Sequence, residues 1–329
     1  MAMIEAKNLC KSFKVFKRPD GIVDNLRSLV VRNYEIKDAV KDISFEISEG
    51  ELVGIIGANG AGKSTTIKML SGILVPSSGN VVVDGKPPYE NRKENALKIG
   101  TVFGQRSQLN WDLPMVDAFE LYKRMYHIED ALYKHNVDRF VDLLNMEEFL
   151  RKPVRQLSLG QKMRAEIAIA MLHSPKILYL DEPTIGLDVL VKDKIRLFAK
   201  ELNKEQKTTV LLTTHDMKDI DTICNRIIMI DHGYILRDMS LKDFKEENQE
   251  SYYVRVEYEK QNQELNYDGI VCISEESNQK LYKVDKRKMD INVMLHFISE
   301  AFVIKSIDIR MEEIEEIVKK YMKINKDEK

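Results

Sequence analysis

The eight residues from Gly57 to Ser64 have the types and spacing of a loop that binds phosphate. They read Gly-Ala-Asn-Gly-Ala-Gly-Lys-Ser and fit the pattern Gly-x-x-x-x-Gly-Lys-Ser/Thr. Glycines let backbone amides turn towards a phosphate, while the ammonium of Lys63 and the hydroxyl of Ser64 suit a phosphate and Mg²⁺. An ordinary glycine-rich turn is the alternative. The apolar segment before the loop and the helical composition after it favour phosphate binding.

Two acidic residues at the end of an apolar run can complete the chemistry of ATP hydrolysis. Residues 177–180 read Ile-Leu-Tyr-Leu, and Asp181 and Glu182 follow directly. One carboxylate can face the metal ion, and the next can polarise the attacking water. We therefore assign Asp181 to Mg²⁺ and Glu182 to the water. A solvated turn or a helix cap is the alternative, which the phosphate loop in the same chain disfavours.

Short runs rich in Val and Ile alternate with segments of helical spacing over most of the chain. This order predicts an α/β core with a mainly parallel sheet. The predicted strands are residues 52–56, 80–83, 99–103, 177–180, 208–213 and 226–230, and the predicted helices are 64–70, 161–172 and 189–202. From Met115 to Leu150 the apolar positions keep helical spacing without a strand signal. We therefore expect a helical insertion in this core, covering about residues 112–172.

Two other parts of the chain differ from this core. Residues 16–37 contain Pro19-Asp20-Gly21, which predicts a loop and a short helix inserted before a strand near Ile43. After residue 238 a charged helical segment is followed by a strand-like alternation at 252–258. We expect a boundary near Glu247, with one domain at 1–247 and a small α+β domain at 248–329. The latter has predicted strands at 252–258, 271–274, 281–284 and 303–309, and predicted helices at 289–301 and 311–322.

Four further segments make the chain similar to the ATPases of ABC transporters. Leu157-Ser-Leu-Gly-Gln161 resembles the signature motif of that family, Gln105 stands where its Q-loop glutamine does, Thr184-Ile-Gly-Leu-Asp188 resembles the D-loop, and Thr214-His215-Asp216 resembles the switch histidine. These segments follow the order of the family, and the resemblance covers residues 3 to about 238. It implies the fold of an ABC nucleotide-binding domain of the P-loop NTPase class, with ATP and Mg²⁺ as cofactors and ATP hydrolysis as the activity.

The resemblance also implies a role for individual residues. Two such domains pair head to tail in this family, so the signature of one chain acts in trans on ATP held by the other. His215 would contact the γ-phosphate, and Gln105 would sense Mg²⁺ and couple to the membrane partner. Phe13 would stack on adenine in the place where the family more often has Tyr, since stacking needs only an aromatic face; Phe16 is the rival.

The complete predicted site follows from the motifs and this resemblance. The predicted catalytic residues are Lys63, Gln105, Glu182 and His215, and the predicted metal ligands are Ser64, Gln105 and Asp181. The predicted nucleotide-binding residues are Phe13, Gly57, Asn59, Gly60, Ala61, Gly62, Lys63, Ser64 and Thr65, joined in trans by Ser158, Gly160 and Gln161. Leu159 replaces a glycine of the usual signature, so its side chain must point away from the nucleotide, or the contact with the partner's phosphate would be weakened.

Composition limits the partners. Lys and Arg total 51 against 53 Asp and Glu, so the formal charge of −2 gives no overall field that would gather nucleic acid. The three cysteines show no metal-binding spacing, which is typical of free thiols in a reducing cytoplasm. The apolar runs are far shorter than the ~20 residues that span a bilayer. The resemblance therefore implies a second copy of the chain and separate integral membrane permease subunits, and we expect a peripheral position on the cytoplasmic face of a bacterial membrane.

The kind of transport is expected from further likenesses. Residues 102–108 and 184–187 resemble bacterial exporter ATPases for drugs, antibiotics and sodium, and residues 16–37 resemble the insertion of polysaccharide exporter ATPases. The segment from Asp112 to Phe119 is the expected docking place for a permease helix. Two alternatives stay open: an ABC protein that acts on ribosomes or DNA, and an ATP-binding switch with little hydrolysis, which Leu159 motivates.

Overall fold

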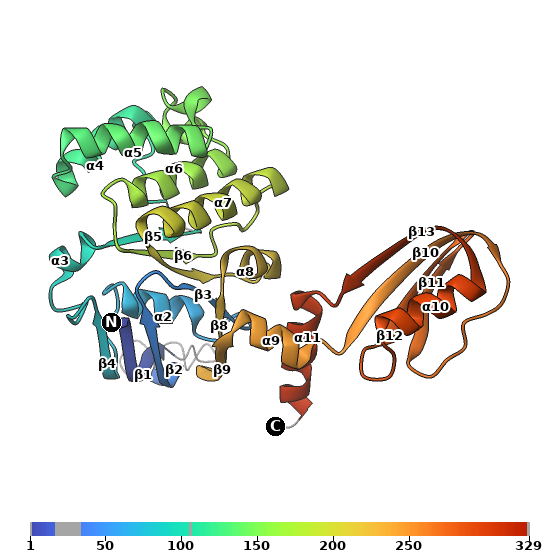
Figure 1. The fold of residues 1–329 in the computed structure, drawn as a ribbon. Helices are drawn as coiled ribbons and strands as arrows, with labels where there is room; N and C mark the ends of the chain where they lie inside the picture. The colour runs from blue at the N-terminus through green and yellow to red at the C-terminus, as the bar shows by residue number, and fades with distance from the viewer. Residues whose placement is uncertain (1, 17–33, 105–106, 328–329) are drawn as a thin grey trace, which may run out of the picture. The chain divides into compact units, whose positions relative to one another are not determined.

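The computed structural model describes residues 2–16, 34–104 and 107–327 (Figure 1). The chain divides into two compact units, Met1–Ser240 and Leu241–Lys329. The division falls at the start of α9 (Leu241–Asn248), whereas the sequence suggested a boundary near Glu247, at the end of this helix. The three cysteines of the chain are free thiols. Within the described ranges, no helix is long and apolar enough to cross a membrane.

A six-stranded sheet forms the centre of the first unit. Its order is β5-β6-β7-β3-β8-β9, and all neighbouring strands run parallel except β8 and β9. The bounds are β3 (Leu52–Ile56), β5 (Ile99–Phe103), β6 (Ile177–Asp181), β7 (Thr209–Thr213), β8 (Arg226–Asp231) and β9 (Tyr234–Ser240). The predicted α/β core is thus confirmed. Because β6, β7 and β3 are adjacent and parallel, their carboxyl ends bring the phosphate loop and the Asp181-Glu182 pair to one edge of the sheet.

A second, antiparallel sheet of order β2-β1-β4 belongs to the same unit. It contains β1 (Ala2–Phe16), β2 (Tyr34–Ser48) and β4 (Ser78–Val83). The expected loop and helix at residues 16–37 are therefore wrong at both ends, where Phe16 pairs with Tyr34 and Phe13 pairs with Lys37. The ladder between β1 and β2 stabilises these ends as strand although their sequence carries a weak strand signal. Residues 17–33 lie outside the described ranges.

Helices accompany both sheets of the first unit. The helical spacing of residues 115–150 corresponds to α4 (Met115–Tyr126) and α5 (Asp130–Leu143), which lie beside α6 (Leu159–Met171) (Figure 1). Phe119, Phe140 and Phe149 are almost fully buried in this helical part. The other described helices are α2 (Lys63–Leu70), α3 (Arg92–Ala96), α7 (Val189–Gln206) and α8 (Met217–Ile223), with short 3₁₀ turns at Glu147–Phe149 and Val154–Gln156.

The second unit is a four-stranded antiparallel sheet with a helix on one face (Figure 1). The order β11-β12-β10-β13 joins β11 (Ile270–Glu276), β12 (Gln279–Asp285), β10 (Ser251–Gln261) and β13 (Phe302–Met311). Tyr252, Val254 and Val256 alternate along β10 and pack in one core with Met294 and Ile298 of α10 (Ile291–Ala301). The last helix, α11 (Ile314–Asp327), begins three residues later than predicted because β13 extends to Met311.

Candidate functional site

The phosphate loop connects β3 to α2 and adopts a backbone that depends on its glycines. Gly62 has φ +113°, and a Cβ on it would lie 2.6 Å from the carbonyl oxygen of Ala39. A Cβ on Gly57 would lie 2.0 Å from the carbonyl oxygen of Ile230. Neither contact is possible for an ordinary side chain, so the loop needs glycine at both positions. The neighbouring backbone of β2 and β8 thus sets the path of the loop.

Lys63 begins α2 and turns its ammonium back over the loop. The Nζ atom donates to the carbonyl oxygens of Gly57 at 2.8 Å and Ala58 at 3.1 Å. Burial lowers the pKa of Lys63, and the negative charges of Glu182 and Asp181 oppose this shift. The buried cation therefore lies beside the carboxylates that end β6. This arrangement concentrates charge of both signs at one place, as phosphoryl transfer requires.

Ser64 and Asp181 face each other across the carboxyl edge of the sheet. The hydroxyl of Ser64 donates to Oδ1 of Asp181 at 2.9 Å, and the hydroxyl of Thr213 on β7 donates to the same oxygen at 2.5 Å. Asp181 is 8% exposed and ends β6. One carboxylate and one hydroxyl fit Mg²⁺, which takes few protein ligands and completes its shell with waters and substrate phosphates.

Glu182 stands at the turn that follows β6. Its φ of +57° is rare for a side chain other than glycine, and such strain is frequent at functional sites. The backbone amide of Glu182 donates to the carbonyl oxygen of Thr213 at 2.9 Å, which fixes this turn to β7. Oε2 of Glu182 lies 2.5 Å from Nδ1 of His215, whose side chain is 58% exposed. The carboxylate predicted to polarise water and the predicted switch histidine are thus in direct contact.

Gly104 packs against the same turn and was missed by the sequence analysis. Its amide donates to the carbonyl oxygen of Asp181 at 2.8 Å, and a Cβ on it would lie 2.2 Å from the carbonyl oxygen of Glu182. A glycine directly before Gln105 was the available signal. Gln105 itself lies outside the described residues, so its predicted catalytic and metal roles stay predictions.

One pocket of about 520 Å³ collects most of the predicted residues. Its lining consists of Phe13, Lys37, Ala39, Asn59, Gly60, Gly62, Lys63, Ser64, Thr65, Glu182, Ile185 and His215. Phe16 is absent from the described lining and makes an edge contact with Tyr34, with ring centroids 6.3 Å apart. This geometry favours Phe13 over Phe16 for adenine. Lys37 and Ala39 were missed because their position depends on the pairing of β1 with β2.

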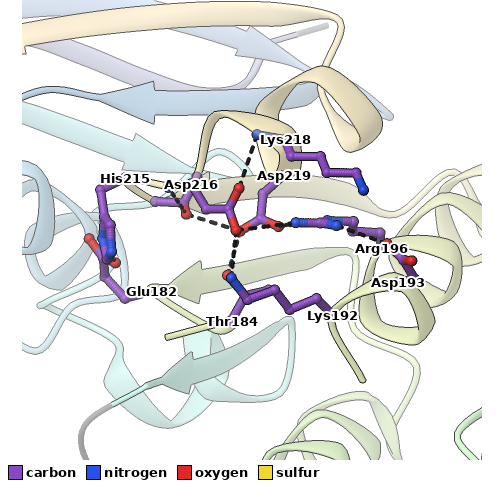
Figure 2. Close-up of polar contacts among 10 residues, drawn as sticks. Glu182, Thr184, Lys192, Asp193, Arg196, His215, Asp216, Lys218 and Asp219 are labelled. Atoms are coloured by element: carbon purple, nitrogen blue, oxygen red, sulfur yellow. Dashed lines mark hydrogen bonds and ion pairs between the residues drawn. The ribbon is translucent and has the colours of Figure 1, made fainter. Parts of the chain in front are cut away.

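A buried polar network holds the two turns that carry Glu182 and His215 (Figure 2). The carboxylate of Asp219 on α8 accepts hydrogen bonds from the hydroxyls of Thr184 at 2.5 Å and Thr214 at 3.0 Å. Its other oxygen accepts from Nε of Arg196 on α7 at 2.7 Å. Asp219 and Arg196 are 0% and 2% exposed. Since Thr184 lies two residues after Glu182 and Thr214 directly precedes His215, one buried ion pair positions both.

The signature residues lie elsewhere on the chain. Ser158 caps α6 through a hydrogen bond from the amide of Gln161 at 3.2 Å, and the side chain of Gln161 accepts from the amide of Ser158 at 2.9 Å. None of the signature residues is among the described lining of the phosphate pocket. Leu159 is 51% exposed, and one of its methyl groups lies 3.2 Å from where a Cβ of Gly186 would stand. The side chain of Leu159 thus packs beside Gly186, in the segment of its own chain that resembles the D-loop.

Comparison with known proteins gives the family. The ABC transporter family model matches residues 40–185. The ABC transporter ATP-binding protein NatA of Bacillus subtilis (strain 168) is 32% identical over 212 residues, which cover 64% of this chain and 86% of NatA. The Nod factor export ATP-binding protein I of Cupriavidus pinatubonensis (strain JMP 134 / LMG 1197) is 31% identical over 204 residues, 62% of each chain. The residues matched by the family model include the phosphate loop, the signature segment and the Asp181-Glu182 pair.

A solved structure agrees with this assignment. The ATP-binding cassette MJ0796, in a dimeric post-hydrolysis state bound to ADP and Pi, is 29% identical to this chain with a TM-score of 0.62. The match covers 73% of this chain and 99% of the cassette. The likeness therefore extends over nearly the whole length of a nucleotide-binding cassette.

Proposed function

We propose, from the premise that this chain belongs to the ABC transporter family, that two copies pair head to tail and hydrolyse ATP to power export through separate permease subunits. The chain is an ATP-binding subunit with the ATPase domain of this family, and its nucleotide is ATP or ADP. Residues 1–247 act as the ATPase domain, with a helical subdomain at about 112–172. Residues 248–329 form an accessory domain.

One observation supports a paired site, in which two copies of the chain together surround each ATP. The pocket gathers the phosphate loop, Glu182 and His215, yet its described lining contains nothing from the signature around Ser158. Within one chain the nucleotide would therefore meet only half of the family's motifs. A second copy facing the pocket supplies Ser158, Gly160 and Gln161, and the dimeric ADP-bound cassette MJ0796 supports such a pair.

The chemistry divides among the residues of the pocket. Lys63 would exchange its bonds to the loop carbonyls for the phosphates of ATP. Ser64 and Asp181 would hold Mg²⁺, which would supply positive charge to the phosphates. Glu182 polarises the attacking water. His215 contacts the γ-phosphate. Because Nδ1 of His215 lies 2.5 Å from Oε2 of Glu182, the position of Glu182 then depends on whether the γ-phosphate is bound. Phe13 stacks on adenine.

Two further features support a membrane partner and export. The stretch after Gln105 exposes apolar side chains, namely Trp111 at 57%, Val116 at 41%, Leu121 at 42% and Met125 at 59%. Exposed apolar side chains of this kind are suited to contact a helix of a permease subunit. Among the relatives, the Nod factor protein is named for export, which supports export here. The chain then works as a peripheral protein on the cytoplasmic face of the membrane.

The decisive experiment blocks hydrolysis while leaving ATP binding intact. Glu182→Gln keeps the volume of the side chain but removes the carboxylate, so ATP and Mg²⁺ should convert the chain into a stable dimer with turnover reduced by ~100-fold or more. Analytical ultracentrifugation with ATP, with ADP and without nucleotide measures this. A Glu182→Gln chain that stays monomeric in saturating ATP overturns the paired site, and unchanged turnover indicates an ATP-binding switch.

A further inference from the structure

The segment that follows Gln105 is held along its length by the region of the signature. The backbone amides of Arg155 and Val154 donate to the carbonyl oxygens of Trp111 at 2.9 Å and Leu113 at 3.1 Å. The ammonium of Lys162 on α6 lies 4.4 Å from the centroid of the Trp111 ring. We define residues 107–113 as the tether segment. Its far end is thus joined to the turns that lead into Ser158.

The near end of the tether segment is bound by one carboxylate on the signature helix. Oε1 of Glu166 accepts hydrogen bonds from the hydroxyl of Ser107 and from the backbone amide of Gln108, the latter at 2.9 Å. Glu166 is 6% exposed and stands in an apolar stretch of α6 between Ala165 and Ile167. Burial raises the pKa of Glu166, and the hydrogen bonds from the tether segment oppose this shift.

Burial of a carboxylate at this position costs free energy. Burying it requires compensation by hydrogen bonds, whereas an apolar side chain would need none and would extend the apolar face of α6. The compensation comes from the tether segment. Loss of this contact would leave the hydroxyl of Ser107 and the amide of Gln108 without the acceptor they now have. The contact therefore gives the tether segment and α6 one preferred relative position.

We propose that Glu166 is a positioning residue that fixes the signature helix to the tether segment, and so orients Ser158 and Gly160 towards the ATP held by the partner chain. Glu166 lies eight residues after Ser158 on α6, which corresponds to about two helical turns or ~12 Å. A shift at Glu166 is transmitted through the helix to its N-terminus. This inference rests on the paired site proposed above and adds a residue that contacts neither nucleotide nor metal.

The first test measures ATP-driven dimer formation in the Glu182→Gln background. Adding Glu166→Ala should raise the ATP concentration needed for half-maximal dimer formation by about tenfold, because one acceptor of two hydrogen bonds is lost. Adding Glu166→Gln, whose carbonyl oxygen still accepts both bonds, should restore the dimer. Glu147→Gln, an exposed change in the same helical part, is the matched control. Binding of ADP to the monomer should stay within about twofold, since the phosphate loop is untouched.

The single tryptophan of the chain reports the tether directly. Trp111 is the only Trp of the sequence, so its emission comes from the tether segment alone. Glu166→Ala should increase acrylamide quenching of Trp111, and Glu166→Gln should leave it near the wild-type value. Equal quenching and equal dimer formation in all three proteins would overturn the proposal. If Glu182→Gln itself fails to dimerise, the paired site fails rather than the role of Glu166.

Mixed dimers distinguish an effect in trans from general damage. In the first dimer, a chain with Glu182→Gln and Glu166→Ala is joined to a wild-type chain, so the only hydrolysing pocket faces the altered signature helix. In the second, the two changes are on different chains, so the hydrolysing pocket faces an unaltered helix. Dimers isolated through two different affinity tags should turn over ATP several-fold more slowly in the first arrangement. Equal rates, or the reverse order, contradict positioning through the partner's ATP.

Discussion

Thr184 and Thr214 donate to the same carboxylate oxygen of Asp219, at 2.5 and 3.0 Å. Thr184 belongs to the turn after Glu182, and Thr214 precedes His215. A single acceptor therefore joins the turn of the carboxylate predicted to polarise water to the turn of the predicted switch histidine (Figure 2). Nε of Arg196 donates to the other carboxylate oxygen of Asp219 at 2.7 Å. The contact between Glu182 and His215 thus depends on an ion pair that is out of reach of solvent.

Asp219→Ala should destabilise the first unit and impair turnover together. The change leaves the guanidinium of Arg196 buried with weaker compensation, which costs about 3 kcal/mol or more. A fall in Tm of roughly 6–12 °C follows for a domain of this size. Asp193→Ala is the control, since Asp193 binds the same guanidinium at 2.8 Å but is 47% exposed, and should cost less than about 1 kcal/mol. Similar Tm values for the two variants would contradict the assigned role of the buried pair.

Gly104→Ala should reduce turnover more than nucleotide binding. The added Cβ would meet the carbonyl oxygen of Glu182 at 2.2 Å, so the turn that carries this carboxylate must move. We expect kcat to fall by about tenfold or more with ATP affinity within about twofold, because misplacement acts on the reacting geometry. Gly85→Ala is the control: its Cβ would meet no atom within 4 Å, and its φ of +80° places backbone strain in a turn outside the pocket lining. A kcat equal to that of the control would show that Glu182 tolerates the shift.

Phe13→Leu and Phe16→Leu separate the two candidates for the adenine contact. Phe13 lines the pocket beside Lys37 and carries the ammonium of Lys11 at 5.3 Å from its ring centroid. Stacking of an aromatic ring on a base contributes about 1–3 kcal/mol, so Phe13→Leu should weaken ATP binding by roughly 5- to 140-fold. Phe16→Leu should leave the dissociation constant near its wild-type value. Calorimetric titration with ATP measures the dissociation constant of each variant. If Phe16→Leu weakens ATP binding more than Phe13→Leu does, the adenine contact belongs to Phe16.

Local patterns predicted the parts of the site that depend on short stretches of chain. The phosphate loop between an apolar strand and a helix, and the acids at the end of another buried strand, need only neighbouring residues to be recognised. Parallel pairing of β6, β7 and β3 then brings these ends together, as an α/β fold predicts. The same reasoning placed most described strands of the central sheet within one or two residues.

Residues whose position depends on distant pairing escaped this reasoning. Lys37 reaches the pocket because it pairs with Phe13 across the β1–β2 ladder, while residues 16–37 were expected as loop and helix. Asp219 is an ordinary charge of a short helix until the fold surrounds it with Arg196 and two threonines. Glu166 did leave a signal, a lone carboxylate in an apolar stretch of α6. Its partner, the amide of Gln108, is 58 positions away in sequence and only the fold identifies it.

His173→Phe should make the stability of the first unit less dependent on pH. His173 stacks on Tyr126 with centroids 4.1 Å apart, and burial lowers its pKa from 6.5 to about 4. The folded chain therefore disfavours the proton that the unfolded chain accepts. The stability linked to neutral His173 is fully present above pH 6.5 and is lost as the pH falls towards 4, reaching about 2 kcal/mol of loss at pH 5. Phe keeps the stacking and removes the titration, so the difference in unfolding free energy between pH 7 and pH 5 should shrink by about this amount in urea titrations. An unchanged difference would mean that other groups dominate the acid sensitivity.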